Sequence, residues 1–243
     1  MRLRAAILLA LFAVSGCNRS AADSDRMASA REFPRAFRPV SALGGNSFTT
    51  EDQRDSVGEA QVVMDLAAIK DGTTVADIGA GDGYYTVHLA SRVGVKGRVL
   101  AQDIDQAAIQ RLGARVERER LDNVSIKLGA ADDPRLPNAS FDRIFMVHMY
   151  HEVSEPYAFL WRLRAALRVR GQVIVVDIDR PTGEHGIPPA LLFCEMGAVG
   201  FRLVEFVRKP ELRGYYAQFE AVGTRPAPDA IKPCRTANGK TGA

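Results

Sequence analysis

Residues 75–90, VADIGAGDGYYTVHLA, place an apolar run directly before a glycine-rich turn and a helix-like pattern. A short apolar run bounded by glycines is typical of a buried strand in a parallel sheet, because such strands are covered on both faces. The glycines let a ligand approach the backbone, and the helix that follows presents its first amides to that ligand. The stretch therefore predicts an α/β fold with a ligand site just after this strand.

Short apolar runs alternate with helical patterns from Glu51 to Gly223, which predicts a mainly parallel sheet with helices on both faces. The expected strands are 74–78, 98–102, 124–128, 141–147, 171–178, 202–207 and 215–222. The expected helices are 52–69, 84–93, 106–120, 155–167 and 189–199. No long helix separates the last two strands, so we expect them to pair antiparallel as a hairpin.

Composition limits the kind of partner. The chain has 243 residues, 47% hydrophobic and 25% charged, which suits one globular domain with short flanking segments. Its net charge is +3, and this falls to +1 (3 − 2) without the first sixteen residues, which carry Arg2 and Arg4. A balance this close to neutral does not indicate a basic nucleic-acid surface, so we expect no nucleic-acid partner.

The glycine turn departs from the dinucleotide fingerprint G-x-G-x-x-G in two ways. The third glycine would fall at position 84, where Tyr84 stands, and it comes one place early as Gly83. In addition, Asp77 stands two residues before Gly79, where a carboxylate would repel a pyrophosphate. The same carboxylate would attract a cationic amino acid or a sulfonium.

These residues resemble motif I of the class I S-adenosylmethionine-dependent methyltransferases, D-x-G-x-G-x-G after the first strand. The similarity continues through GRVLAQDID, LGAADDPRLPNASFDRIFMVHMYHEV, LRAALRVRGQVIVVDID and EMGAVGFRLVEF, over about 170 residues in the expected order. The resemblance implies a Rossmann-like fold, with a seven-stranded, mostly parallel sheet, an antiparallel last strand and helices on both faces. It also implies S-adenosylmethionine as the cofactor, activity of the type EC 2.1.1.- and a small-molecule methyl acceptor.

Carried over by motif, the first set of cofactor residues lies in the glycine loop. Asp77, Gly79 and Ala80 resemble the positions that hold the methionine end of the cofactor, and Gly81 and Gly83 give the backbone clearance.

The second set follows the next three strands. Asp103 resembles the acidic residue that accepts from both ribose hydroxyls, for which a carboxylate has two suitable oxygens. Ile104 would pack on the adenine face, Ala131 and Asp132 would meet the adenine amino group, and Val147 would flank the methionine portion. Asp105 is the alternative ribose ligand, but its position also suits a helix N-cap.

The stretch HMYHE, residues 148–152, suggests catalysis at the acceptor. His148 and His151 are candidate bases that would take a proton from a hydroxyl acceptor, with Glu152 as a possible orienting group. Contact with the acceptor and a structural loop are the alternatives. The stretch does not match the zinc motif H-E-x-x-H in either direction, so no metal ligands are predicted.

Two other functions fit the same fold, because fold alone does not fix function. One is a non-catalytic envelope lipoprotein that kept the fold as a nucleoside- or ligand-binding module. The other is a different enzyme of the aminopropyl-transferase type, although HMYHEV stands where those enzymes usually carry paired aspartates. The intact Asp77, glycines and Asp103 favour the methyltransferase.

The N-terminus resembles a bacterial lipoprotein signal. A cationic start and an apolar run too short to span a bilayer end at Val14-Ser15-Gly16-Cys17, which predicts a signal peptide over 1–16 and lipidation of Cys17. Residues 17–50 would then be a lipidated flexible tether and 51–223 the methyltransferase domain. This predicts a periplasm-facing lipoprotein of the cell envelope, held at the membrane by its lipid alone. A cytoplasmic protein is the alternative if the signal is not used.

The remaining sequence offers two cysteines and a C-terminal segment. Residues 224–243 carry prolines and small residues without an apolar period, so they are predicted to be a disordered tail. Cys194 lies in an apolar helical pattern and is predicted to be a small buried hydrophobic residue. A disulfide between Cys194 and Cys234 is the alternative.

Overall fold

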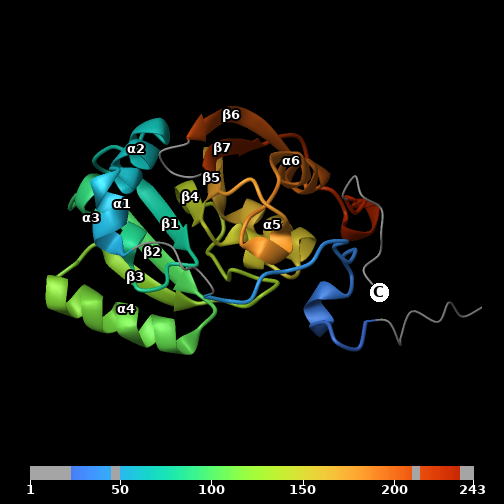
Figure 1. Ribbon diagram of the computed structural model, residues 1–243, viewed down its shortest axis with the longest axis horizontal. Coiled ribbons are helices and arrows are strands. Elements are labelled where there is room, and N and C mark those ends of the chain that lie inside the picture. The colour runs from blue at the N-terminus through green and yellow to red at the C-terminus, as the bar shows by residue number, and fades with distance from the viewer. Residues whose placement is uncertain (1–22, 45–49, 210–213, 236–243) are drawn as a thin grey trace, which may run out of the picture.

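A seven-stranded sheet forms the centre of the computed structural model, which describes residues 23–44, 50–209 and 214–235. The strand order is β3-β2-β1-β4-β5-β7-β6 (Figure 1). The strands are β1 (Thr74–Ile78), β2 (Arg98–Asp103), β3 (Val124–Leu128), β4 (Phe141–Val147), β5 (Leu167–Asp177), β6 (Phe201–Lys209) and β7 (Gly214–Ala221). Neighbouring strands from β3 to β5 pair in parallel, and β7 runs antiparallel to both β5 and β6. The predicted fold class is confirmed.

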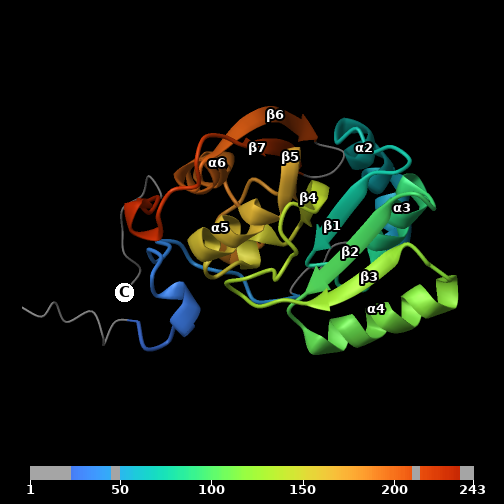
Figure 2. The same ribbon diagram turned by 180° about the vertical axis from the view of Figure 1, so that it is seen from behind.

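Helices cover both faces of the sheet, as Figures 1 and 2 show from opposite sides. They are α1 (Glu51–Ser56), α2 (Glu59–Leu66), α3 (Tyr84–Val93), α4 (Gln106–Glu119), α5 (Pro156–Ala166) and α6 (Pro189–Ala198). Short 3-10 turns include η1 (Ala28–Ala30), η2 (Tyr150–Glu152), η3 (Thr182–Glu184) and η5 (Pro228–Ala230).

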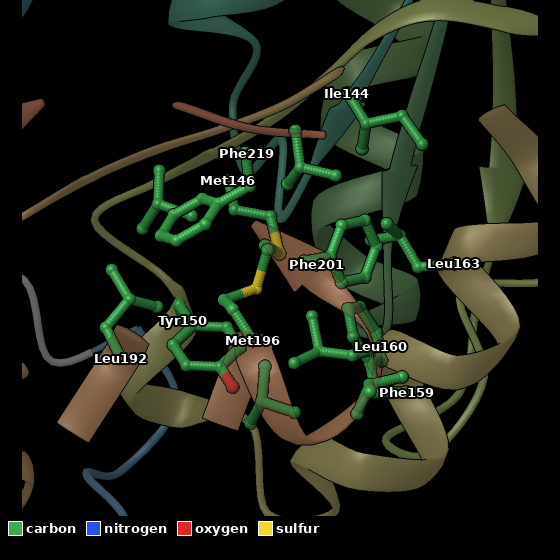
Figure 3. Close-up of a cluster of buried hydrophobic side chains, with 14 of the residues drawn as sticks. Ile144, Met146, Tyr150, Phe159, Leu160, Leu163, Leu192, Met196, Phe201 and Phe219 are labelled. Atoms are coloured by element: carbon green, nitrogen blue, oxygen red, sulfur yellow. The ribbon is translucent and has the colours of Figure 1, made fainter. Parts of the chain in front are cut away.

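Two apolar cores follow from the alternation of side chains along the central strands. Ile144 and Met146 of β4 belong to the core under α5 and α6, part of which is drawn in Figure 3. Phe145, between them in sequence, belongs to the core under α2 and α3. The central strands β1 and β4 are therefore covered on both faces, which explains the mainly apolar runs 75–78 and 144–147, whereas the edge strands β3 and β6 are largely exposed.

The helix predicted over 52–69 is broken in the structure. Gly58 adopts a left-handed conformation (φ 64°) and separates α1 from α2. The positive φ of Gly58 ends the first helix, and the apolar side chain of Val57 just before it is left 43% exposed. Because glycine adopts this conformation without strain, the break falls where the sequence permits it.

An N-terminal strap, residues 23–44, packs on the domain, so the prediction of a flexible tether over 17–50 is wrong for this part. Figure 1 shows the strap in blue beside the α5 side of the molecule. Two buried ion pairs hold it: Arg26 pairs with Glu155 at 2.6 Å and Arg38 with Glu195 at 2.9 Å. Breaking a buried pair of this kind leaves an uncompensated charge, which costs several kcal/mol.

The C-terminal segment from Gly223 to Arg235 is also packed, which corrects the prediction of a disordered tail for these residues. The Trp161 indole donates to the Pro226 carbonyl at 2.8 Å, and Ile231 is buried. Cys234 forms a disulfide with Cys194 of α6, with a Cα–Cα distance of 6.0 Å. Cys194 is therefore half of a covalent link rather than a free buried hydrophobic residue.

The signal peptide and Cys17 lie outside the described residues. Among the residues that the structure does describe, no helix combines the length and the hydropathy needed to cross a bilayer.

Removing the disulfide should destabilise the protein measurably. The link closes a loop of 40 residues, for which the loss of unfolded-state entropy corresponds to about 2–4 kcal/mol. We expect the double variant Cys194→Ser/Cys234→Ser to lose this amount of unfolding free energy in urea denaturation.

Dithiothreitol supplies the matched control. It should lower the stability of the native protein to that of the double variant and leave the double variant unchanged. Equal stability of native and double-variant protein without reductant would contradict a disulfide in the folded chain.

Candidate active site

A cavity of about 700 Å³ opens at the carboxyl ends of β1, β2 and β4. These strands pair in parallel, so the loops that follow them meet at one edge of the sheet. The cavity volume lies within the range of small-molecule sites, about 300–1,000 Å³. Its walls come from the glycine turn, the end of β2, the loop after β3, the segment after β4 and the end of the strap.

The glycine turn follows β1 directly, and Gly79, Gly81 and Gly83 all have positive φ. A Cβ on Gly83 would lie 2.5 Å from a methyl carbon of Leu112, so this glycine allows α4 to pack against the turn. A Cβ on Gly79 would lie 2.9 Å from Met149. A Cβ on Gly81 would meet nothing within 4 Å, and Gly81 borders the cavity. The turn is thus tight against the protein at both ends and open to a ligand in the middle.

Three amides of the turn, those of Ala80, Gly81 and Gly83, are already bonded within the protein. Ala80 N donates to the Gln102 carbonyl at 3.0 Å, and Gly83 N donates to the Ala80 carbonyl at 2.9 Å. Gly81 N donates to the Asp103 carboxylate, also at 2.9 Å. A pyrophosphate site needs such amides for the phosphate oxygens. The turn is therefore poorly suited to a dinucleotide.

The charges around the cavity point the same way. Among the side chains that line it, five are acidic and two are basic: Glu51, Asp82, Asp103, Asp105 and Glu152 against Arg54 and Arg111. Arg111 is paired with Asp82 at 2.7 Å, Arg54 with Glu59 at 2.6 Å, and Glu51 with Arg115 at 2.5 Å. Among the lining carboxyls of the described residues, this leaves those of Asp103, Asp105 and Glu152 without a Lys or Arg partner. A surplus of negative charge favours a ligand that carries positive charge.

Asp103 ends β2 and lies beside the turn. One carboxylate oxygen accepts from Gly81 N and the other from Asp105 N, both at 2.9 Å. Each carboxylate oxygen has a second lone pair, so Asp103 keeps capacity for two donors such as the hydroxyls of a diol. Asp105 instead accepts from Ala107 N at the start of α4, the N-cap role considered as its alternative.

The cavity brings together seven of the ten predicted cofactor residues: Gly79, Ala80, Gly81, Asp103, Ile104, Ala131 and Val147. Gly83 lies behind the wall against α4. Asp77 is buried beneath the turn and accepts from the Thr86 hydroxyl at 2.6 Å. Burial raises the pKa of Asp77 to about 6, and the nearby Asp103 adds to the rise against the opposing effects of Thr86 and Arg54.

Asp132 differs from its prediction. Its carboxylate is 1% exposed, accepts from the Ser29 hydroxyl at 2.6 Å, and pairs with Arg162 at 2.8 Å. The strap thus engages the group that was expected to meet an adenine. Ala131, its neighbour, remains on the cavity wall.

His148 lies on the cavity wall and has positive φ (54°), a conformation uncommon for a residue other than glycine. Its Nε2 lies 3.4 Å from a carboxylate oxygen of Glu59, which also accepts from Arg54 and from the Tyr85 hydroxyl. Burial raises the pKa of Glu59, but the bonds from His148 and Arg54 outweigh it and lower the pKa to about 2. A buried carboxylate therefore holds the histidine ring in place at the cavity.

His151, the second candidate base, lies behind this wall. Its Nδ1 is 3.0 Å from both carboxylate oxygens of Asp177, the last residue of β5. Glu152 does line the cavity, and burial raises the pKa of its carboxyl to about 7. Asp177 and Glu59 were missed by the sequence reasoning, because no motif marks a carboxylate that acts through a distant histidine.

Gln102 is a further residue that the sequence reasoning missed. It borders the cavity, is buried, and its side-chain amide has no hydrogen-bond partner among the described residues. A buried amide without a partner costs free energy unless a ligand or water satisfies it. The open middle of the turn and the acceptors on Asp103 fit a nucleoside-sized ligand.

Comparison with known proteins agrees with this geometry. Residues 75–180 match a family model described as a methyltransferase domain. The structure is similar to a SAM-dependent methyltransferase from Aquifex aeolicus, with 25% identity, a TM-score of 0.62 and coverage of 69% of this chain and 90% of that one.

Curated relatives match over shorter lengths. A nocamycin O-methyltransferase of Saccharothrix syringae is 34% identical over 83 residues, which is 34% of this chain and 30% of that protein. The ubiquinone/menaquinone biosynthesis C-methyltransferase of Hahella chejuensis is 26% identical over 125 residues, 49% and 48% of the two chains. The chain thus spans half or less of these two relatives.

The fold and these matches together support a class I methyltransferase. The predicted cofactor, S-adenosylmethionine, is confirmed, because the chain matches a methyltransferase family model and is similar in structure to a SAM-dependent methyltransferase.

Glu59 should matter for stability in a pH-dependent way. Its pKa is about 2 in the folded protein against an ordinary 4.5, so its stabilising effect is complete above pH 4.5 and is lost as the pH falls toward 2. We expect Glu59→Gln to cost up to about 3 kcal/mol of unfolding free energy at pH 7, with the difference shrinking through this window.

Asp65→Asn is the control on the same helix. Asp65 is exposed and paired with Arg92, so its loss should change stability little at any pH. Urea denaturation of the three proteins between pH 7 and pH 3 makes the comparison, and a loss for Glu59→Gln that is independent of pH would contradict the assignment.

Proposed function

We propose that the protein is an S-adenosylmethionine-dependent methyltransferase acting on a small molecule. One observation carries the proposal: Asp103 stands at the end of β2 with spare acceptor capacity, beside a glycine turn in which the amides of Ala80, Gly81 and Gly83 are bonded within the protein. This arrangement accepts a ribose diol and offers little to a pyrophosphate. The acidic surplus of the cavity supports a ligand with a sulfonium and an ammonium group.

Different residues of the chain would contact different parts of the cofactor. Asp103 would accept from the ribose hydroxyls, Ile104 and Ala131 would bound the adenine, and the glycine turn would lie along the methionine portion. When bound, S-adenosylmethionine supplies an electrophilic methyl group.

His148 is the residue that we propose for the acceptor side. It lies on the cavity wall next to Val147, and Glu59 fixes its ring. An imidazole there would take the proton from a hydroxyl acceptor. In such a displacement, the larger part of the rate enhancement comes from holding the acceptor in line with the methyl group. His151, which lies behind the wall, is not assigned this role.

Calorimetry with S-adenosylhomocysteine tests the proposed function. We expect the purified protein to bind it and to bind NAD much more weakly, because the turn offers few amides to phosphates. Asp103→Ala should lower the affinity for S-adenosylhomocysteine by about 1–3 kcal/mol, or roughly 5- to 150-fold, since the ribose hydroxyls lose their acceptors.

Two variants make the result specific. Asp105→Ala removes the N-cap of α4 and should cost less affinity than Asp103→Ala. Asp103→Asn keeps one acceptor oxygen for the bond from Gly81 and should fall between the two. Tighter binding of NAD than of S-adenosylhomocysteine would refute the proposal, and a larger effect at Asp105 would reassign the ribose ligand.

For localisation, we propose a lipoprotein that faces the periplasm, anchored through Cys17. The lipoprotein-type signal supports this proposal, and so does the disulfide between Cys194 and Cys234, because such links persist in oxidising compartments. S-adenosylmethionine is made in the cytosol, so an enzyme in the envelope would need an imported or local supply.

Mass spectrometry of the native N-terminus tests the anchor. We expect the mature chain to begin at a lipid-modified Cys17, and Cys17→Ala to leave the chain unprocessed or to release it from the membrane fraction. A soluble chain that still begins at Met1 without lipid would place the protein in the cytosol.

A further inference from the structure

Two histidines and a glutamate meet beside the cavity, outside the cofactor-binding wall. His151 and Glu152 belong to η2 after β4, and His185 follows η3 after β5. One ligand atom from each of the three side chains lies within 4.8 Å of the other two. The rings of His151 and His185 stand almost perpendicular, with centroids 5.6 Å apart.

Both histidines have an unused nitrogen in this cluster. His151 is 1% exposed, and its Nε2 is buried without a hydrogen-bond partner among the described residues. His185 Nδ1 is likewise buried and unpartnered in the described part of the chain. Leaving two such atoms unsatisfied in neighbouring imidazoles is costly, which points to a ligand that both rings would bind.

Asp177 explains how His151 is oriented. Because a carboxylate only accepts, Nδ1 of His151 carries the hydrogen that the two Asp177 oxygens share at 3.0 Å. Nε2 then has a lone pair directed at the cluster, 4.0 Å from a Glu152 oxygen. A carboxylate that holds the far nitrogen of a histidine is the usual second partner of a metal-binding imidazole.

Ser41 of the strap ties the two ligand-bearing segments together. Its amide donates to the His151 carbonyl at 3.4 Å, and its hydroxyl accepts from His185 N at 2.9 Å. The same hydroxyl donates to the Thr182 carbonyl at 2.6 Å. The histidines are thus held in place by backbone contacts, independently of any ligand.

We propose that His151 Nε2, His185 Nδ1 and the Glu152 carboxylate form a binding site for a divalent transition metal of the zinc type. Two imidazoles and one carboxylate are a recurrent set for Zn²⁺ sites that keep a fourth position open. Mg²⁺ and Ca²⁺ prefer oxygen ligands and fit the set poorly. Bonds of about 2.0–2.2 Å would draw the three atoms closer than they lie here, through side-chain rotation.

Such a site would adjoin the cavity, because Glu152 lines it. The metal site goes beyond the proposed methyl transfer and stands on its own contacts. Its test accordingly uses no cofactor and no acceptor.

The experiment measures binding of Zn²⁺ to untagged, metal-stripped protein, by competition with a chromogenic chelator, and of Co²⁺ by its visible absorption. We expect one equivalent of Zn²⁺ per chain and Co²⁺ bands that Zn²⁺ abolishes. His185→Asn should lower the Zn²⁺ affinity at least 100-fold, and asparagine tolerates the left-handed backbone at this position (φ 56°). Asp177→Asn should lower it 10- to 100-fold by releasing His151.

His88→Ala is the matched control, since His88 lies in α3 away from the cluster, and it should bind Zn²⁺ like the native protein. Circular dichroism shows whether each variant folds, and His185→Asn still tests the proposal where Asp177→Asn does not fold. Absence of a Zn²⁺ equivalent in the native protein, or the same affinity in native protein and His185→Asn, would overturn the metal site.

Discussion

The hydrogen bond from Gly81 N to the Asp103 carboxylate connects the two parts of the candidate site on which the proposed binding of the cofactor depends. Gly81 belongs to the turn after β1, and Asp103 ends β2, the neighbouring parallel strand. The bond fixes the turn against the strand end and sets where a diol can be accepted. It also uses an amide that an anion site would need, so the same contact favours one class of nucleoside ligand over another.

The sequence predicts the sheet well because the signals for it are local. The bounds of β1, β3, β4 and α3 agree with the predicted ranges. Each of these elements is a run of uniform apolar or amphipathic character, ended by glycine or polar residues, and its period alone determines its type. The antiparallel pairing of β6 and β7 followed from the short connection between them.

The strap, the tail and much of the candidate site could not be predicted in the same way, because their placement depends on single contacts between distant residues. Arg38 and Glu195 are 157 residues apart, and nothing around Arg38 indicates that it will be buried. In the strap, the Ser29 hydroxyl donates to Asp132. Asp132, which the motif would assign to the cofactor, is therefore bonded within the protein. His185 shows the same limit, since it lies 34 positions after His151 and no local motif contains both residues.

The packing of the strap bears on the proposed anchor at Cys17, because it sets how far the domain could reach from the lipid. A flexible segment from Cys17 to residue 50 would span at most about 115 Å when extended. The chain is instead fixed to the domain at Arg26, so only nine residue steps remain, with a contour length of about 30 Å. A connection of this length between the lipid and the domain would keep the domain close to the bilayer. An acceptor would then be met in the thin layer at the membrane surface rather than in the open volume of the compartment.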